Sequence, residues 1–264
     1  MEICGDHKLS FRDRILYLLQ NARRNFSISR AQSEAFNPPK VYVETVLRRS
    51  PSRLLADLFL EHELSKLNQN SLNILEIGCG SGSMARKLSL LGYTGSYVGI
   101  DVSDNRFDRS IDCNLEVSLV RTDAHDYVPD KTLDLIISFS ALEHIPREDA
   151  LLRRLRKHMK DGGTEIHIVP GASALITYLW HGYRQYGILA IRERLGEGQV
   201  IRLGGFGSLL VHFCTITIPE IIFGFRFRRL APLWYDRLVV AGLMIDRALP
   251  LLPTGLAFVR TNRQ

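Results

Sequence analysis

The feature that most constrains this chain is a short apolar run that leads directly into three alternating glycines. Residues 74–77 read Ile-Leu-Glu-Ile, and Gly78, Gly80 and Gly82 follow at every second position. Glycine reaches backbone conformations with positive φ and lets a ligand approach the main chain closely. A helix that begins after such a turn presents free N–H groups and a partial positive charge. The run therefore predicts a buried strand, a ligand-binding turn and a helix, and a tight turn without a ligand is the less favoured interpretation.

Short apolar runs alternate with helical stretches after residue 71, which is typical of a parallel sheet whose strands are joined by helices. Helices are expected at Ser83–Leu91 and Glu148–Met159, and Gly162-Gly163 is expected to end the second one. The sequence therefore predicts an α/β fold. The expected strands are Leu72–Ile77, Tyr97–Asp101, Leu115–Val120, Leu133–Phe139, Glu165–Val169, Val200–Leu203 and Leu256–Arg260.

Two segments depart from this alternation. Residues 1–70 read as helices, and Ser50 supplies a capping hydroxyl ahead of Pro51 in a first helical turn. Residues 204–255 are apolar and irregular, and they fit the sheet pattern poorly. We expect 1–70 to form a helical extension or lid. Residues 71–264 are expected to form the main domain, with 204–255 as an apolar insertion before its last strand.

The apolar insertion is long enough to suggest a membrane span. Leu203–Phe225 holds only His212 and Glu220 as ionisable residues. Pro219 and several glycines argue against a clean spanning helix. Basic and aromatic residues follow at 225–235, a combination typical of a segment that rests on an anionic membrane. A lid or dimer patch packed on the core is the alternative.

Composition narrows the setting of the protein. With 264 residues, 45% of them hydrophobic, the chain can bury a large core, which excludes a disordered tail and a disulfide miniprotein. The net charge of +6 is scattered, so we expect a solvated surface or attraction to phosphate groups and anionic lipids, and no nucleic-acid partner. The four cysteines show no C-x-x-C spacing, so no metal is expected. Their spacing and the polar N-terminus predict a cytoplasmic protein, at the inner face of the membrane if the insertion binds lipid.

An acidic residue follows the glycines at the spacing of a nucleotide site. Asp101 lies 19 residues after Gly82 and ends the next expected strand, where a carboxylate can accept both hydroxyls of a ribose. Gly80-x-Gly82-x-x-Ala85 also satisfies the dinucleotide fingerprint in its alanine variant, so NAD and S-adenosylmethionine both remain open. Glu76 suits a cationic amino-acid ligand better than a pyrophosphate. Its alternative role is a buried carboxylate bonded to local backbone N–H groups.

These motifs together resemble the class I S-adenosylmethionine-dependent methyltransferases. Glu76-x-Gly78-x-Gly80-x-Gly82 is similar to the first motif of that family, and Asp101 to its ribose-binding acid. Residues 122–126, Thr-Asp-Ala-His-Asp, resemble the loop after the third strand, where an aspartate meets the adenine. The resemblance covers roughly residues 70–170. Its remaining parts are 134–145, which resemble the fourth strand and its helix, 162–170, which resemble the fifth strand, and 256–260, which resemble an antiparallel edge strand.

The resemblance implies a doubly wound, Rossmann-like sheet of seven mostly parallel strands, with S-adenosylmethionine lying across the carboxyl ends of the first strands. Asp123 is favoured for the adenine over Asp126, whose alternative is to cap a turn. The residues that the resemblance places around the cofactor are Glu76, Gly78, Gly80, Gly82, Asp101, Asp123, Ala124 and Ser140.

Methyl transfer from a sulfonium needs alignment more than activation, although a hydroxyl nucleophile benefits from a base. His144 is the candidate catalytic base, and its alternative is a packing or capping histidine. His167 is expected to pack within the sheet. His181, Tyr183 and Arg184 are candidates to bind a sugar- or phosphate-bearing acceptor, because arginine suits phosphate and aromatic faces suit sugars. An ordinary helix–loop connection is the alternative for that segment.

These observations predict a methyltransferase that acts on an oxygen of a small-molecule, lipid-linked or saccharide acceptor. An NAD-dependent oxidoreductase is an alternative, although Glu76 and the lack of paired hydride-transfer residues count against it. A catalytically inactive module that binds an adenosyl ligand is the other alternative.

Overall fold

The computed structural model describes residues 2–25 and 33–262, which form two compact units. Unit 1 consists of Met1–Glu61, Val169–Glu193 and Val200–Ala257, and unit 2 of His62–Ile168, Arg194–Gln199 and Phe258–Gln264. The units interleave along the chain, so the expected boundary at residue 70 remains a prediction drawn from the sequence pattern.

The helices and strands follow one another along the chain. The elements are α1 (Phe11–Asn25), β1 (Glu34–Ala35), α2 (Val43–Val46), α3 (Pro51–Leu64), β2 (Leu72–Ile77), α4 (Ser83–Leu90), β3 (Gly95–Asp101), β4 (Leu115–Arg121), β5 (Leu133–Phe139), η1 (Leu142–His144), α5 (Glu148–Arg156), β6 (Met159–Pro170), α6 (Ala174–Tyr178), α7 (Ile188–Leu195), β7 (Gln199–Leu203), α8 (Phe206–His212), η2 (Phe213–Ile222), α9 (Phe227–Leu230), α10 (Pro232–Ala248) and β8 (Gly255–Thr261).

The strands form a mostly parallel sheet in the order β1-β7-β8-β6-β5-β2-β3-β4, which confirms the α/β, Rossmann-like class. The sheet has eight strands rather than the expected seven, because the two-residue β1 pairs with β7. The last strand, β8, lies between β7 and β6, so its expected place at the sheet edge is wrong. It runs antiparallel to β6, since the N–H of Gly162 meets the carbonyl of Asn262 while Gly171 meets Thr254.

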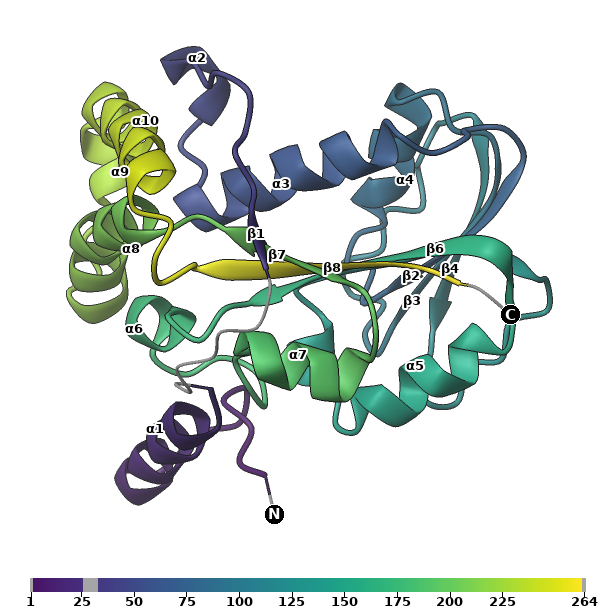
Figure 1. The fold of residues 1–264 in the computed structure, drawn as a ribbon, viewed down its shortest axis with the longest axis horizontal. Coiled ribbons are helices and arrows are strands. Elements are labelled where there is room, and N and C mark those ends of the chain that lie inside the picture. Colours follow the sequence, from purple (N-terminus) through teal and green to yellow (C-terminus); the bar gives the residue numbers. More distant parts are fainter. Residues whose placement is uncertain (1, 26–32, 263–264) are drawn as a thin grey trace. The chain divides into compact units, whose positions relative to one another are not determined.

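Unit 2 contains the parallel strands β2 to β5, and the glycine turn follows β2. β2 lies between β3 and β5, with Glu76 opposite Gly99 on one side and Ile137 on the other. Such a central strand is covered on both faces, which is why its sequence is a continuous apolar run. Helices α4 and α5 lie on opposite faces of these strands (Figure 1). All parallel strands in this group point their carboxyl ends toward one edge.

The end of α5 differs from the expectation. The helix stops at Arg156, and Gly162-Gly163 lie inside β6 instead of capping the helix. The pairing register with β5 shifts between Leu133 and Leu135, so the glycines form an irregularity in the strand. Gly162 there adopts a φ of 79°. A helix end and a strand bulge both favour a glycine with positive φ, so the dipeptide alone did not distinguish them.

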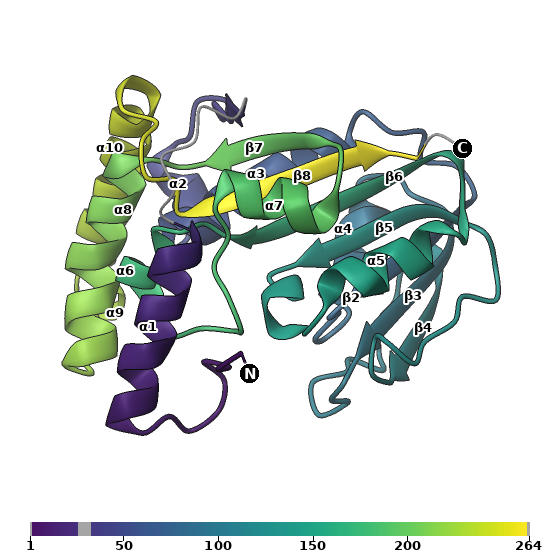
Figure 2. The same ribbon diagram turned by 60° about the horizontal axis from the view of Figure 1, so that its bottom comes forward.

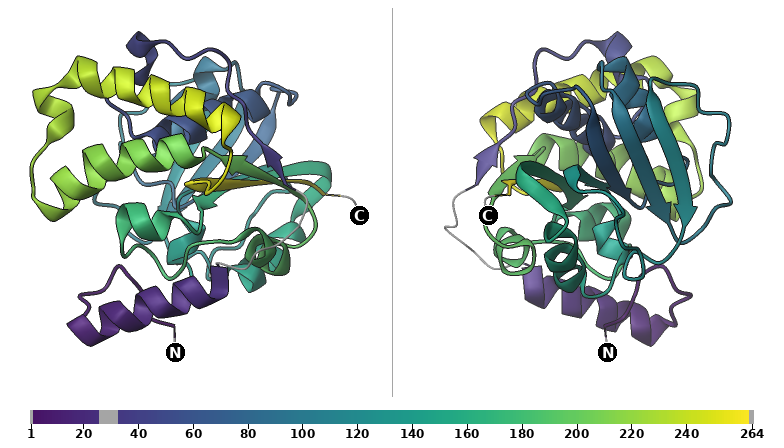
Figure 3. Two further views of the ribbon diagram at one scale, coloured as in Figure 1. Left: turned by 60° about the vertical axis from the view of Figure 1, so that its left-hand side comes forward. Right: turned by 90° about the vertical axis from the view of Figure 1, so that its right-hand side faces the viewer.

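Unit 1 is largely helical, and the expectation that residues 204–255 are irregular is wrong. α8 and η2 run one way and α10 returns beside them, with α9 at the turn (Figure 2; Figure 3). Gly207 and Gly242 let α8 and α10 approach closely, because a Cβ on Gly207 would collide with the carbonyl of Gly242. No helix among residues 2–25 and 33–262 is long and apolar enough to cross a membrane. The predicted cap of α3 is confirmed, since the Ser50 hydroxyl accepts the N–H of Arg53 at 3.3 Å.

Candidate functional site

The glycine turn after β2 is open at its centre and tightly packed at its ends. Gly78, Gly80 and Gly82 have φ angles of 72°, 56° and 77°, a region that side chains disfavour. A Cβ on Gly78 would collide with Ala141, and one on Gly82 would lie 2.8 Å from a methyl group of Leu119. A Cβ on Gly80 would meet no atom within 4 Å. The turn therefore leaves room beside the Gly80 backbone, where a bound ligand can lie.

Asp101 fastens this turn to the end of β3. Its Oδ2 accepts the N–H of Gly80 at 2.9 Å, and its Oδ1 accepts the N–H of Ser103 at 3.1 Å. A carboxylate has about four lone-pair sites, so these two bonds leave acceptor capacity for the hydroxyls of a ribose. Together, the open Gly80 position and this carboxylate fit an adenosyl ligand. The link to Gly80 was not predicted from the sequence, because it depends on how β2 and β3 pair.

Glu76 is buried beneath the turn and accepts a hydrogen bond from the hydroxyl of Tyr97. Burial, and then the charge of Glu76, hold the pKa of Tyr97 well above its usual range. The neighbouring Cys79 thiol has its pKa raised to about 12, mainly by burial and then by Glu76 and Asp101. The tyrosine partner was not among the alternatives considered from the sequence. Tyr97 lies two positions before Gly99, the residue that pairs with Glu76. This relation could be recognised only once the register between β2 and β3 was known.

The loop after β4 carries the predicted adenine residues. Asp123 is exposed, and its Oδ1 accepts the N–H of His125 at 2.8 Å. The carbonyl of Asp123 accepts the N–H of Asp126, so both acids lie in one turn. Arg154 holds the loop from α5, because its guanidinium donates to the carbonyl of Ala124 at 2.7 Å. Sequence reasoning missed Arg154, which looked like one more basic residue of an amphipathic helix.

The loop after β5 carries Ser140 and His144. Ser140 is exposed and has a φ of 50°. This conformation is unfavourable for a residue other than glycine, and such residues cluster at functional sites. His144 ends the single turn η1, and its Nε2 lies 3.8 Å from a carboxylate oxygen of Glu143. The ring of His125 bonds the carbonyl of Pro146 at 2.8 Å, which ties this loop to the one after β4. Unit 2 thus gathers the predicted cofactor residues at the carboxyl ends of β2 to β5, whereas their binding roles remain predictions.

A hollow of about 400 Å³ adjoins the glycine turn. Its lining includes Ile111 and Leu119, which are also the side chains nearest to Gly82. Acidic and basic residues of the loop after β3 and of β4, among them Asp104 and Arg121, complete the lining. Sequence reasoning did not predict this hollow, because it arises where a loop folds over the face of an edge strand.

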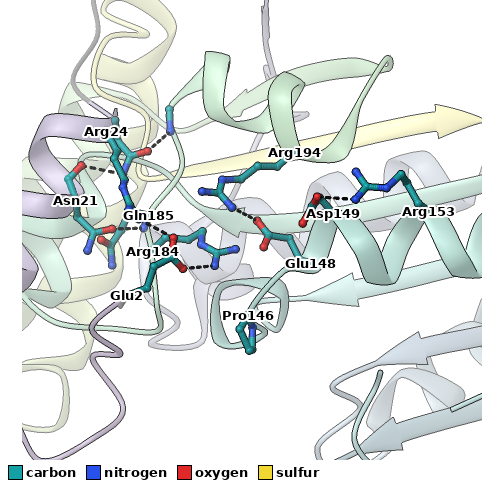
Figure 4. Close-up of polar contacts among 12 residues, drawn as sticks. Glu2, Asn21, Arg24, Pro146, Glu148, Asp149, Arg153, Arg184, Gln185 and Arg194 are labelled. Atoms are coloured by element: carbon teal, nitrogen blue, oxygen red, sulfur yellow. Dashed lines mark hydrogen bonds and ion pairs between the residues drawn. The ribbon is translucent and has the colours of Figure 1, made fainter. Parts of the chain in front are cut away.

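The three candidate acceptor residues lie in unit 1. Arg184 is only 3% exposed, and its guanidinium bonds Glu2 at 2.8 Å, while the other oxygen of Glu2 pairs with Arg24 at 2.7 Å (Figure 4). His181 and Tyr183 are partly exposed. Arg184 therefore already holds the N-terminal segment, and its role toward an acceptor remains a prediction.

A buried ionic cluster supports β6 of unit 2. Arg156 bonds both oxygens of Glu165, at 2.7 and 2.8 Å, and His167 bonds Glu165 at 3.3 Å and Ser138 at 2.8 Å. Burial raises the pKa of Glu165, but hydrogen bonds from His167 and Arg156 outweigh it and lower the pKa to about 2. The ring of His167 also stacks on Phe258. The expectation that His167 is a packing residue is confirmed.

The sequence matches the model of a known family. Residues 46–206 match the family described as "Methyltransferase domain". Among curated relatives, ubiquinone biosynthesis O-methyltransferase of Rickettsia conorii is 26% identical over 121 residues, covering 44% of this chain and 41% of the relative. The mitochondrial enzyme of that name from Candida albicans is 23% identical over 164 residues, covering 60% and 50%. The chain thus spans half or less of the length of these relatives. Phosphoethanolamine N-methyltransferase 3 of Arabidopsis thaliana is 27% identical over 154 residues, covering 52% and 29%.

Solved structures share the fold at low sequence identity. A SAM-dependent methyltransferase from Archaeoglobus fulgidus has a TM-score of 0.53 and 19% identity, covering 83% of this chain and 97% of that one. Coclaurine N-methyltransferase, bound to N-methylheliamine and SAH, has a TM-score of 0.51 and 12% identity, covering 97% and 89%. At these identities the likeness establishes the fold alone.

Proposed function

Since the chain belongs to the class I S-adenosylmethionine-dependent methyltransferase family, we propose that it transfers the methyl group of S-adenosylmethionine to an oxygen of a small-molecule acceptor. The observation that carries the proposal is the glycine turn, open at Gly80 and fastened there to the carboxylate of Asp101. A turn built this way leaves open space beside the Gly80 backbone, with the carboxylate of Asp101 next to it. That combination suits a ligand with an amino-acid end and a ribose.

Gly78, Gly80 and Gly82 would approach the amino-acid and ribose parts of the cofactor, with Asp101 on the ribose hydroxyls and Asp123 with the Ala124 backbone N–H toward the adenine. Glu76, Tyr97 and Ser140 would complete the surroundings. When bound, S-adenosylmethionine supplies a methyl group that is already activated by its sulfonium. The remaining task of the protein is to align the acceptor and to exclude water.

His144 is the proposed base for a hydroxyl nucleophile, because its ring is partly exposed on the loop after β5. An oxygen acceptor is favoured over nitrogen because seven curated relatives carry the name ubiquinone biosynthesis O-methyltransferase. His181, Tyr183 and Arg184 are proposed to contact that acceptor. Replacing His144 by Gln should lower the rate of methyl transfer without changing cofactor affinity.

We further propose that the acceptor is lipid-linked rather than a free saccharide, and that the protein meets it at the inner face of a membrane. Helices α8 to α10 of unit 1 support this, because Phe223, Phe225, Leu230, Leu233 and Trp234 are all exposed there. Exposed aromatic and aliphatic side chains beside arginines are typical of a surface that contacts lipid.

Isothermal titration with S-adenosylmethionine, S-adenosylhomocysteine and NAD tests the cofactor. We expect the first two to bind and NAD not to bind, whereas the reverse result would favour the NAD-dependent oxidoreductase. Incubation of cell lipid and saccharide extracts with methyl-labelled S-adenosylmethionine then tests the reaction. We expect the label in a lipid fraction as a methyl ether. Binding without any labelled product would identify a catalytically inactive module.

A further inference from the structure

Helix α1 turns polar residues inward. Tyr17, Asn21 and Asn25 follow one another at intervals of four, lie on one face and are all buried. A surface helix ordinarily buries an apolar stripe and exposes polar residues. The buried face of α1 is therefore the reverse of the usual arrangement, and its polar groups need partners.

Those partners are backbone and side-chain groups of residues 181–187 in the same unit. The hydroxyl of Tyr17 donates to the carbonyl of His181 at 2.6 Å and accepts the side-chain N–H of Gln185 at 2.9 Å. The backbone N–H of Gln185 donates to Asn21 at 3.1 Å, and Figure 4 shows these two side chains together. The N–H of Gly187 donates to Asn25 at 3.2 Å. The inner face of α1 thus holds the segment that carries the proposed acceptor residues.

The outer face of α1 is apolar. Phe11, Ile15 and Leu19 repeat the same four-residue interval and are 80%, 44% and 60% exposed. Arg12 and Arg23 are exposed beside this stripe. Three large apolar side chains in one exposed row are costly in water, and the arginines flank a surface that suits an anionic partner.

Unit 1 has a second exposed apolar region. α1 begins at the end of the unit where the chain turns between η2 and α9 (Figure 2; Figure 3). That turn exposes Phe223 and Phe225 together with Arg226 and Arg229. Two separate parts of the chain therefore present the same combination of aromatic, aliphatic and arginine side chains.

We propose that α1 is a membrane-facing helix, whose outer stripe of Phe11, Ile15 and Leu19 rests on an anionic lipid surface while its inner face holds residues 181–187. A second copy of the chain is the less suitable occupant, because a symmetric contact would bring the flanking arginines of both copies together. Anionic head groups instead neutralise those arginines, and the stripe enters the acyl boundary. The reason for the protein to contact a membrane rests on the proposed lipid-linked acceptor. The contact itself is inferred from the geometry of α1.

Flotation of the full chain with vesicles tests the inference. Vesicles of phosphatidylcholine alone are compared with vesicles that contain phosphatidylglycerol. We expect binding to the anionic vesicles, weakened roughly tenfold or more when Phe11, Ile15 and Leu19 are all replaced by Ser. Leu90→Ser is the matched control, since Leu90 is 89% exposed on α4 of unit 2, and it should leave vesicle binding unchanged.

Three further measurements keep the result interpretable. Arg12→Glu with Arg23→Glu should weaken binding to the anionic vesicles even if the serine variant folds poorly. The inference is overturned if either variant binds vesicles like the wild type, or if the wild type is a dimer that the serine variant converts to a monomer. Titration with S-adenosylmethionine should be unaffected by all these substitutions. Failure of the wild type to bind that cofactor would overturn the proposed function and leave the vesicle result standing.

Discussion

The two compact units differ in how many of their large apolar side chains are exposed to water. Among the exposed large hydrophobic side chains of the described residues, only Leu90, Val102 and Val128 belong to unit 2, and all the others belong to unit 1. Unit 2 hides its apolar residues between strands and helices, as a self-sufficient core does. Unit 1 leaves rows of them in water, which indicates that its surface has a further partner.

The buried polar groups differ in the same sense. Unit 2 buries a charged cluster, in which Arg156 at the end of α5 and Glu165 of β6 satisfy each other. Unit 1 buries the charged Arg184, but it also buries neutral groups such as Asn21 and Tyr17, which bond to a neighbouring loop. The comparison indicates that unit 2 forms a rigid scaffold, whereas unit 1 holds the loop of residues 181–187 in place. Four predictions test this difference, beginning with the largest expected effect.

The largest loss of folding stability is expected when the buried cation of unit 2, Arg156, is removed. Arg156→Ala leaves the carboxylate of Glu165 buried without its bidentate partner, which should lower the free energy of unfolding by about 3–5 kcal/mol. Arg228→Ala breaks a bidentate pair with Glu220 in unit 1, but that pair is partly exposed, so the loss should be about 1 kcal/mol. Urea unfolding measures both. Equal losses would contradict the view that the buried pair of unit 2 contributes more stability than the partly exposed pair of unit 1.

Removing the acid at the glycine turn should affect binding more than folding. Asp101→Ala should weaken S-adenosylmethionine binding by about 2–4 kcal/mol, because charge-assisted hydrogen bonds to the ribose and to Gly80 are lost. Asp149→Ala is the matched control, an acid of α5 that pairs with Arg153 at 2.8 Å. Calorimetric titration measures the affinities, and an unchanged affinity in the first variant would remove Asp101 from the site.

Acid should destabilise unit 1 before unit 2. Burial, and then the charge of Arg228, lower the pKa of His212 to about 4, so the folded state favours the neutral ring. This stabilisation is present above pH 6.5 and is lost as the pH falls toward 4, by at most about 3 kcal/mol. The depressed pKa of Glu165 supports folding above about pH 4.5 and fails only as the pH approaches 2. Thermal melts between pH 7 and 4 should show a falling melting temperature that His212→Phe flattens, and a parallel decline in both proteins would rule the histidine out.

The smallest effect is expected where α1 holds the loop. Asn21→Ala leaves the N–H of Gln185 buried without its acceptor, which should cost about 1–2 kcal/mol. Amide hydrogen exchange should accelerate at residues 181–187. Arg23→Ala, on the exposed side of the same helix, should leave that exchange unchanged. If exchange is equally fast in the wild type, the polar face of α1 does not order the loop.

The strands of unit 2 were the most predictable part of the molecule. Leu72–Ile77 and Leu133–Phe139 were predicted with the bounds that the structure shows, because fully covered parallel strands appear as unbroken apolar runs. Residues 204–255 were not predictable in the same way. Their helices are apolar on several sides and contain Gly207 and Pro219, so no helical period stood out from the sequence.

Partners across long sequence distances were also missed. Tyr97 was overlooked beside Glu76 and Arg154 beside Ala124, although each residue was plainly visible in the sequence. Their pairing depends on strand register and on the direction in which a helix face points. Likewise, residues 1–70 were expected to form helices, but the sequence did not show which face of α1 is buried.

The sequence by itself determined the order of strands and helices, the glycine turn and the acid one strand away, because these follow from backbone preferences and local spacing. Only the tertiary structure decided that Asp101 holds Gly80, that Arg184 holds Glu2, and that α1 turns its polar side inward. The physical reason is that a hydrogen bond between distant residues exists only once the chain has brought both groups out of water to the same place.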